Sequence, residues 1–333
     1  MFRRNLPKNL VLAYVALTGA TILWGAANPI IKLTLGYIPP ITFLFLRFLI
    51  ACIILLPYVL YETQKTKIDK RDYLNIFLFG LFSQTSLILI FVGLEYTTVV
   101  ESSIIGILGS ILTVAAGHYF YKDNVNKGVK VGLLIASLGT LFVIIEPLFT
   151  GNIHNTSLVE RTFGNFLVFL YNITWVIFIV WSKFSMGEER SSLLKKALSF
   201  IQLKPMKKEY SSTFLTALSL YVGLATVTPL AFLENTGYIG NNPPFDIFSI
   251  KPIGIIGLLY MAICSSIIAY MLYQWSLKYV KVSDTAFFGY LAPILTLPFS
   301  YVILGELPTK SMVIGAIIIG IGVYISGKNL NNH

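Results

Sequence analysis

The chain has 333 residues, of which 56% are hydrophobic and only 12% are charged, and its net charge is +10 at pH 7. Soluble domains carry roughly 25% charged residues, because water must hydrate their whole outer surface. This composition, with a mean hydropathy of +0.75, excludes a soluble enzyme and a nucleic-acid-binding domain and indicates an integral membrane protein. The excess positive charge then bears on which side of the bilayer each loop lies.

Apolar runs long enough to cross a bilayer recur along the whole chain. A helix needs about 20 mostly apolar residues to span the hydrocarbon layer, and only a structure that satisfies its own backbone hydrogen bonds is stable there. The sequence therefore predicts an all-α integral membrane protein with ten transmembrane helices. The expected spans are 10–35, 39–61, 73–94, 97–121, 129–149, 163–184, 212–233, 252–275, 282–304 and 310–327.

Lysine and arginine are distributed unevenly between the two sides of this topology. One side carries nineteen of the 25 and the other carries three, while Lys32, Arg47 and Lys183 lie within spans. Because positive residues accumulate in cytoplasmic loops, we expect a plasma-membrane protein with both termini in the cytoplasm. The longest loop, 185–211, is basic and has apolar residues at helical spacing. It is either an amphipathic helix on the membrane surface or a solvated linker.

Two segments of the chain match each other at a separation of 183 residues. GLEYTTVVESSIIGILGSILT (93–113) aligns without a gap with SLKYVKVSDTAFFGYLAPILT (276–296), and a second match pairs Trp24 with Trp175 and Lys32 with Lys183. We therefore expect two related five-helix repeats, 1–150 and 151–333, the second with the basic insertion 185–211. Since five is odd, the repeats have inverted topology, which is typical of transporters that work by alternating access.

Four segments carry a family resemblance. ILWGAANPIIK (22–32), FLFLRFLIA (43–51), LEYTTVVESSIIGILGSILT (94–113) and YLAPILTLPFSYVILGELPT (290–309) resemble the drug/metabolite transporter superfamily, specifically its EamA-like group of ten-helix transporters. The resemblance extends over essentially the whole chain. It implies a carrier or exchanger of small metabolites, often amino acids or related compounds, driven by protons or another gradient.

Polar side chains inside the spans are the candidate substrate-binding residues, because such groups should face a cavity or a partner rather than lipid. Trp24, Asn28 and Lys32 share one helix face, which offers an indole, an amide and a cation to a small polar ligand. Packing between helices is the alternative for the aromatic residues and Gln84, and a position near the outer surface is the alternative for Lys32. The full set is Trp24, Asn28, Lys32, Gln84, Tyr171, Trp175 and Tyr270.

The remaining charged residues inside the spans have other expected roles. Arg47 is expected to pair with carbonyl groups at a helix end rather than with substrate. Glu101 and Asp284 occupy matching positions in the two repeats and are candidate proton carriers, with helix capping as the alternative.

The expected function is secondary active transport of small polar metabolites, in particular amino acids or related compounds. No catalytic residues, cofactor or metal site are expected, since the three histidines are scattered. A polytopic membrane enzyme such as a transferase is the alternative, and it would need histidine or carboxylate groups at the interface. The expected partners are a small metabolite, the lipid bilayer and protons as the candidate coupling ion, with a monomer or a homodimer as the oligomeric state.

Overall fold

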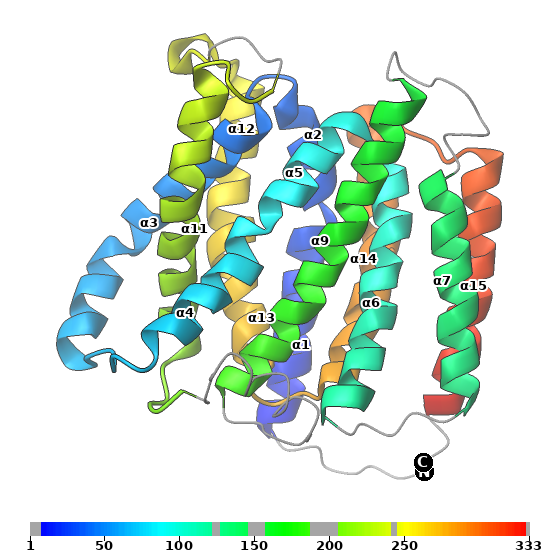
Figure 1. Ribbon diagram of the computed structural model, residues 1–333, viewed down its shortest axis with the longest axis horizontal. Coiled ribbons are helices and arrows are strands. Elements are labelled where there is room, and N and C mark those ends of the chain that lie inside the picture. The colour runs from blue at the N-terminus through cyan, green and yellow to red at the C-terminus, as the bar shows by residue number, and fades with distance from the viewer. Residues whose placement is uncertain (1–7, 122–126, 146–156, 187–205, 241–244, 331–333) are drawn as a thin grey trace.

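The computed structural model describes residues 8–121, 127–145, 157–186, 206–240 and 245–330, and within these ranges the regular structure is helical (Figure 1). Long apolar runs without strand-type alternation favour helices whose outer faces contact lipid. The first half of the chain forms α1 (Lys8–Gly25), α2 (Ala27–Leu35), α3 (Pro40–Lys65), α4 (Tyr73–Gly80), α5 (Leu87–Tyr96), α6 (Val99–Tyr121) and α7 (Lys127–Ile145).

The second half of the chain forms a similar series of helices. They are α9 (Leu158–Ser185), α11 (Ser212–Asn235), α12 (Pro252–Tyr260), α13 (Tyr270–Ser276), α14 (Val282–Leu304) and α15 (Lys310–Leu330), with a short 3-10 turn at Ile247–Ser249. Two π-helical segments, Leu81–Thr85 and Met261–Ala269, join α4 to α5 and α12 to α13. The surface helix expected within the insertion 185–211 falls mostly on residues 187–205, which lie outside the described residues.

Seven helical rods in the described residues are long and apolar enough to cross a membrane, which confirms the all-α membrane fold. They correspond to seven of the ten expected spans, and α7, α14 and α15, whose described apolar stretches are shorter, occupy the other three. The count of ten therefore stays a prediction. The seven rods are Lys8–Leu35, Pro40–Lys65, Tyr73–Tyr96, Val99–Tyr121, Leu158–Ser185, Ser212–Asn235 and Pro252–Ser276.

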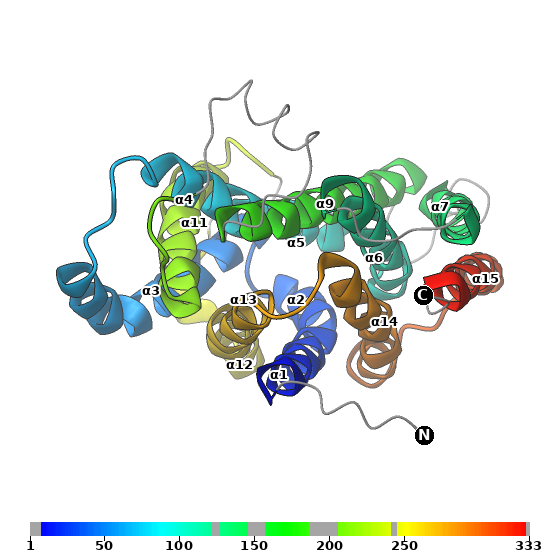
Figure 2. The same ribbon diagram turned by 90° about the horizontal axis from the view of Figure 1, so that it is seen from below.

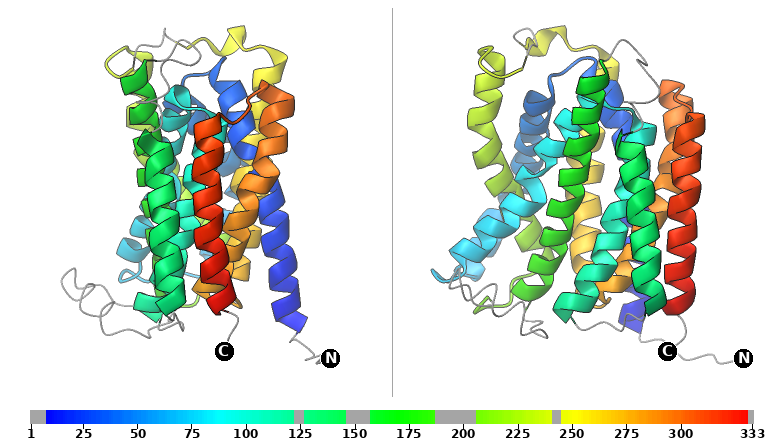
Figure 3. Two further views of the ribbon diagram at one scale, coloured as in Figure 1. Left: turned by 90° about the vertical axis from the view of Figure 1, so that its right-hand side faces the viewer. Right: turned by 45° about the vertical axis from the view of Figure 1, so that its right-hand side comes forward.

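The helices form a bundle in which early and late segments of the chain alternate (Figure 2). The helix α6 packs against α14, α3 against α11, α5 against α9, and α1 against both α13 and α14. At one edge of the bundle, α7 and α15 lie side by side (Figure 3). Large apolar side chains such as Leu134, Leu138 and Ile317 are exposed there, as expected for a face that contacts lipid tails.

The contact between α7 and α15 depends on a glycine. A Cβ atom added at Gly322 would lie 2.5 Å from the Gly132 carbonyl oxygen and 2.6 Å from the Ala136 nitrogen, so backbone would have to move. We expect Gly322→Ala to lower the free energy of unfolding by about 1–3 kcal/mol, the usual effect of overpacking. Unfolding of the detergent-solubilised protein measures this. Gly320→Ala is the matched control, because its Cβ would meet nothing within 4 Å; equal effects of the two variants would contradict the prediction.

Candidate substrate-binding site

A cavity of about 200 Å³ lies between helices of the two halves of the chain. This is smaller than the ~300–1,000 Å³ of pockets that take drug-sized ligands, so the cavity suits a small metabolite. Its lining comes from α1, α2, α3, α5 and α6 on one side and from α9, α13, α14 and the π-helical segment 261–269 on the other. At Gly106 a Cβ atom would meet nothing within 4 Å, because this part of α6 borders the open space.

Four aromatic side chains form one wall of the cavity. The ring of Trp24 lies with its centroid 5.4 Å from that of Trp175, 5.1 Å from Tyr270 and 5.2 Å from Tyr273. The two tryptophans are nearly perpendicular, an arrangement favoured by the ring quadrupoles. All four residues line the cavity, so α1 meets α9 and α13 through a continuous aromatic cluster.

Two further predicted residues also lie at the cavity. Asn28 and Tyr171 are among its lining residues, and the Asn28 amide nitrogen lies 3.5 Å from the Ser102 hydroxyl of α6. The lining also carries hydroxyl and amide groups that can hydrogen-bond a polar ligand. These include Thr21, Ser102, Ser103, Ser110, Thr113, Asn172, Thr285 and Thr296.

Lys32 and Gln84, which were also predicted to bind substrate, are not among the described residues that line the cavity. The Lys32 ammonium donates hydrogen bonds to the carbonyl oxygens of Leu94 (2.6 Å), Glu95 (3.2 Å) and Thr97 (2.9 Å), at the C-terminal end of α5. A cation there also compensates the helix dipole. The Gln84 amide donates to the Ser219 hydroxyl at 3.3 Å and so joins the π-helical segment 81–85 to α11.

Arg47, expected to pair with carbonyls at a helix end, instead borders the cavity. Its Nε donates to the Ser266 hydroxyl and its Nη2 to the Ser265 hydroxyl at 3.4 Å. Both serines lie in the π-helical segment 261–269. Arg47 and Tyr273 were not predicted to bind substrate, although a charged residue inside a span, such as Arg47, is a signal for such a role.

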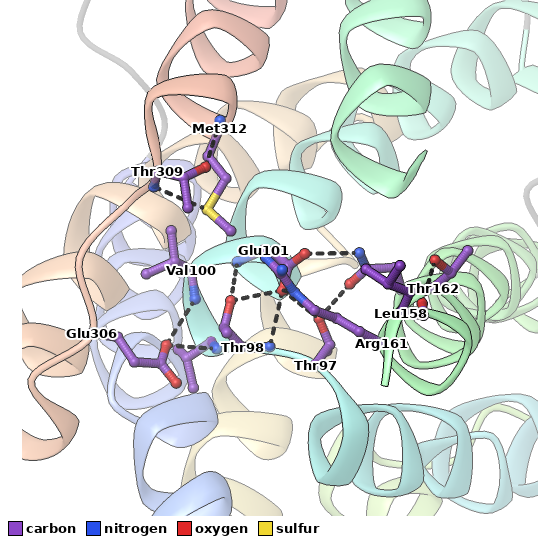
Figure 4. A network of polar contacts seen from close by, with 12 residues as sticks. Thr97, Thr98, Val100, Glu101, Leu158, Arg161, Thr162, Glu306, Thr309 and Met312 are labelled. Atoms are coloured by element: carbon purple, nitrogen blue, oxygen red, sulfur yellow. Dashed lines mark hydrogen bonds and ion pairs between the residues drawn. The ribbon is translucent and has the colours of Figure 1, made fainter. Parts of the chain in front are cut away.

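Glu101 is fully buried at the start of α6, where its contacts are those of a cap and an ion pair (Figure 4). Its Oε2 accepts hydrogen bonds from the Thr98 nitrogen (3.2 Å) and from the hydroxyls of Thr97 (3.0 Å) and Thr98 (2.9 Å), while Arg161 Nε of α9 lies at 2.9 Å. Its Oε1 accepts from the Asn165 amide at 3.0 Å. These contacts support the capping alternative for Glu101.

A second carboxylate caps the same helix. Glu306, from the loop between α14 and α15, accepts hydrogen bonds from the backbone nitrogens of Val99 at 2.8 Å and Val100 at 3.2 Å (Figure 4). Its motif was part of the family resemblance, but its contact partner was not predicted. The side chain of Asp284, the other predicted proton carrier, lies outside the described residues, and its backbone belongs to the first turn of α14.

Apolar helices of membrane-spanning length that enclose a small polar and aromatic cavity define a multi-pass membrane protein. The chain belongs to the EamA-like transporter family, whose pattern matches residues 11–145 and again 162–327. This confirms the family resemblance, and the protein is accordingly a transporter.

Relatives and one solved structure resemble nearly the whole chain. An uncharacterized transporter of Bacillus subtilis, YyaM, is 25% identical over 315 residues, which cover 93% of this chain and 92% of that protein. An uncharacterized transporter of Archaeoglobus fulgidus is 24% identical, with 97% and 98% covered. A protein known from its crystal structure has the same fold with a TM-score of 0.59 at 17% identity, covering 95% of this chain and 98% of that one.

Proposed function

We propose that the protein is a secondary active transporter that moves small polar metabolites, in particular amino acids or related compounds, by alternating access. The observation that carries the proposal is the cavity of about 200 Å³ between the two halves of the chain, lined by aromatic rings, hydroxyls and amides. Such a lining provides stacking area together with a few directional hydrogen bonds, which is how small-molecule sites achieve specificity. A membrane transferase stays the alternative, and among the described lining residues the one charged group is that of Arg47.

Alternating access by two inverted repeats, 1–150 and 151–333, is part of this proposal. Three observations support it. The family pattern matches each half separately, at 11–145 and 162–327. The π-helical segments Leu81–Thr85 and Met261–Ala269 overlap when the chain is shifted by the 183 residues of the sequence match. Helices at matching positions in the two halves also pack in pairs, α6 with α14 and α7 with α15.

The proposed location is the plasma membrane, with both termini in the cytoplasm. The start of α1 and the end of α15 lie at the same face of the bundle (Figure 3), as an even number of spans requires. The nineteen positive residues assigned to that face support the orientation. Proton coupling through Glu101 and Asp284 stays a prediction, as does the choice between a monomer and a homodimer.

Solute exchange across a sealed bilayer tests the transport proposal. We expect the protein in liposomes loaded with one unlabelled compound to take up the same compound in labelled form, because a carrier that binds alternately from each side exchanges substrate without an energy source. The panel consists of amino acids, their carboxylate analogues and their amine analogues. Protein-free liposomes are the control. Exchange no faster than in that control for every compound of the panel would contradict the proposed substrate class.

A further inference from the structure

Arg47 is the one charged residue among those that line the cavity in the described part of the chain. It lies on α3, and only 2% of its surface is exposed. A guanidinium group is always ionised in proteins, so this site holds a buried positive charge. Such a charge is costly unless an anion or several hydrogen bonds compensate for it.

The described residues compensate the charge of Arg47 incompletely. Its hydrogen bonds go to two neutral hydroxyls, on Ser265 and Ser266, and Nη1 makes none to a described residue. Its guanidinium carbon lies 5.6 Å from the ring centre of Phe91 and 5.8 Å from that of Phe48, which adds cation–π attraction. Within the described ranges no carboxylate lies within ion-pair distance of Arg47.

Arg161 shows how the same fold treats an arginine with an internal counterion. Its side chain is also buried, and its Nε lies 2.9 Å from the carboxylate of Glu101. It is not among the residues that line the cavity. The two buried arginines thus differ in their counterion. The chain supplies a carboxylate to Arg161, whereas the described residues supply none to Arg47, which lies at the cavity.

Ser265 connects the positive charge with the aromatic wall. Its hydroxyl accepts the hydrogen bond from Arg47, while its carbonyl oxygen accepts one from the Trp24 indole nitrogen at 3.3 Å. Trp24 in turn contacts Trp175 and Tyr270. A ligand whose negative group meets Arg47 would therefore have its remaining atoms beside the aromatic rings.

We propose that Arg47 binds the carboxylate of a substrate that carries one carboxylate on an aromatic or apolar body. The planar guanidinium group matches a carboxylate and forms charge-assisted hydrogen bonds with it. One cation balances one negative charge, whereas a phosphate dianion would leave the cavity with an unpaired charge. This inference rests on the proposed transport function and specifies its substrate class.

Three probes of nearly equal shape test the assignment on the wild-type protein. Phenylacetate, phenylacetamide and phenethylamine share a phenyl ring and differ in the charge of the polar group. We expect phenylacetate to raise the unfolding temperature of the purified protein by mass action, and to bind at least about tenfold more tightly than the other two. Binding of phenethylamine or phenylacetamide as tight as that of phenylacetate, or no binding of phenylacetate, would overturn the assignment.

Variants identify the residue responsible. We expect Arg47→Gln to abolish the shift caused by phenylacetate, and Arg47→Lys, which keeps the charge but not the planar fork, to retain a reduced shift. Lys32→Gln removes a cation that caps α5 outside the cavity lining, so it should keep the phenylacetate shift even if the protein is less stable. An unchanged shift in Arg47→Gln would overturn the proposal, and if that variant does not fold, an unreduced affinity in Arg47→Lys would do so.

The same compounds distinguish failure of this inference from failure of the transport proposal. Exchange of an amine across liposomes without binding of phenylacetate would leave the transporter in place and overturn the carboxylate site. Binding of phenylacetate that depends on Arg47, with no exchange of any compound, would support the anion site and contradict transport.

Discussion

Replacing Arg161 with glutamine is expected to lower the free energy of unfolding by about 3–5 kcal/mol, because it leaves the carboxylate of Glu101 buried without its cation. Both side chains of this pair are almost fully shielded, with 2% and 0% exposure, and the two charged atoms lie 2.9 Å apart. The pair joins α9 to the first turn of α6, so its loss should also loosen that contact. Reversible unfolding of the purified protein in detergent micelles measures the change.

Two comparisons separate the ion pair from a general effect of losing an arginine. The double variant Glu101→Gln with Arg161→Gln removes both charges, and we expect it to be less destabilised than Arg161→Gln alone. Arg71→Gln changes an exposed arginine in the loop before α4 and should alter stability by less than about 0.5 kcal/mol. A loss below about 1 kcal/mol in Arg161→Gln would show that the pair contributes little to the fold.

The fold class follows from the sequence because composition and span length are properties of whole segments. The expected span 73–94 and the observed rod Tyr73–Tyr96 start at the same residue, and several other limits agree similarly. The π-helical segments were not predicted, because an extra residue in a turn shifts the helical phase, and in spans that are apolar on most faces this shift leaves little trace in the sequence. Yet the segment Met261–Ala269 supplies both serines that contact Arg47.

The cations show where prediction from sequence stops. Lys32 was predicted to bind substrate, and Arg47 was predicted to pair with carbonyls at a helix end. Lys32 donates to three carbonyls at the end of α5, and Arg47 borders the cavity. Both residues lie in spans with apolar residues on every side, so the rotation of each helix is set by packing against other segments of the chain. The face shared by Trp24, Asn28 and Lys32 indicated which side of that helix is polar, but not that the cavity ends before Lys32.

The aromatic wall was easier to anticipate than the cations. Trp24 and Trp175 were paired by the repeat match, and a large ring fills a helix interface whichever way its polar edge points. Their contact at 5.4 Å agrees with that pairing. Tyr273 was missed, although it lies three residues after Tyr270 on α13 and so shares its helix face, a spacing that could have placed it on the same wall.

Replacing Trp24 with alanine is expected to weaken substrate binding by about 2 kcal/mol or more, roughly thirtyfold in dissociation constant, because buried aromatic anchors dominate such sites. Trp24 contacts Trp175, Tyr270 and Tyr273, so its removal deprives the whole wall of its central ring. Trp175→Ala should have a similar effect. The affinity of the compound identified by exchange in liposomes, titrated against each purified variant, measures the loss.

Loss of a large side chain also creates a void, so stability and binding must be measured on the same samples. Trp275→Ala serves as the matched control, because this tryptophan contacts Tyr279 and is not among the residues that line the cavity. If Trp275→Ala weakens binding as much as Trp24→Ala does, the loss comes from a loosened bundle. If both cavity variants stay folded and bind with unchanged affinity, the substrate contacts other walls, and the aromatic cluster only packs α1 against α9 and α13.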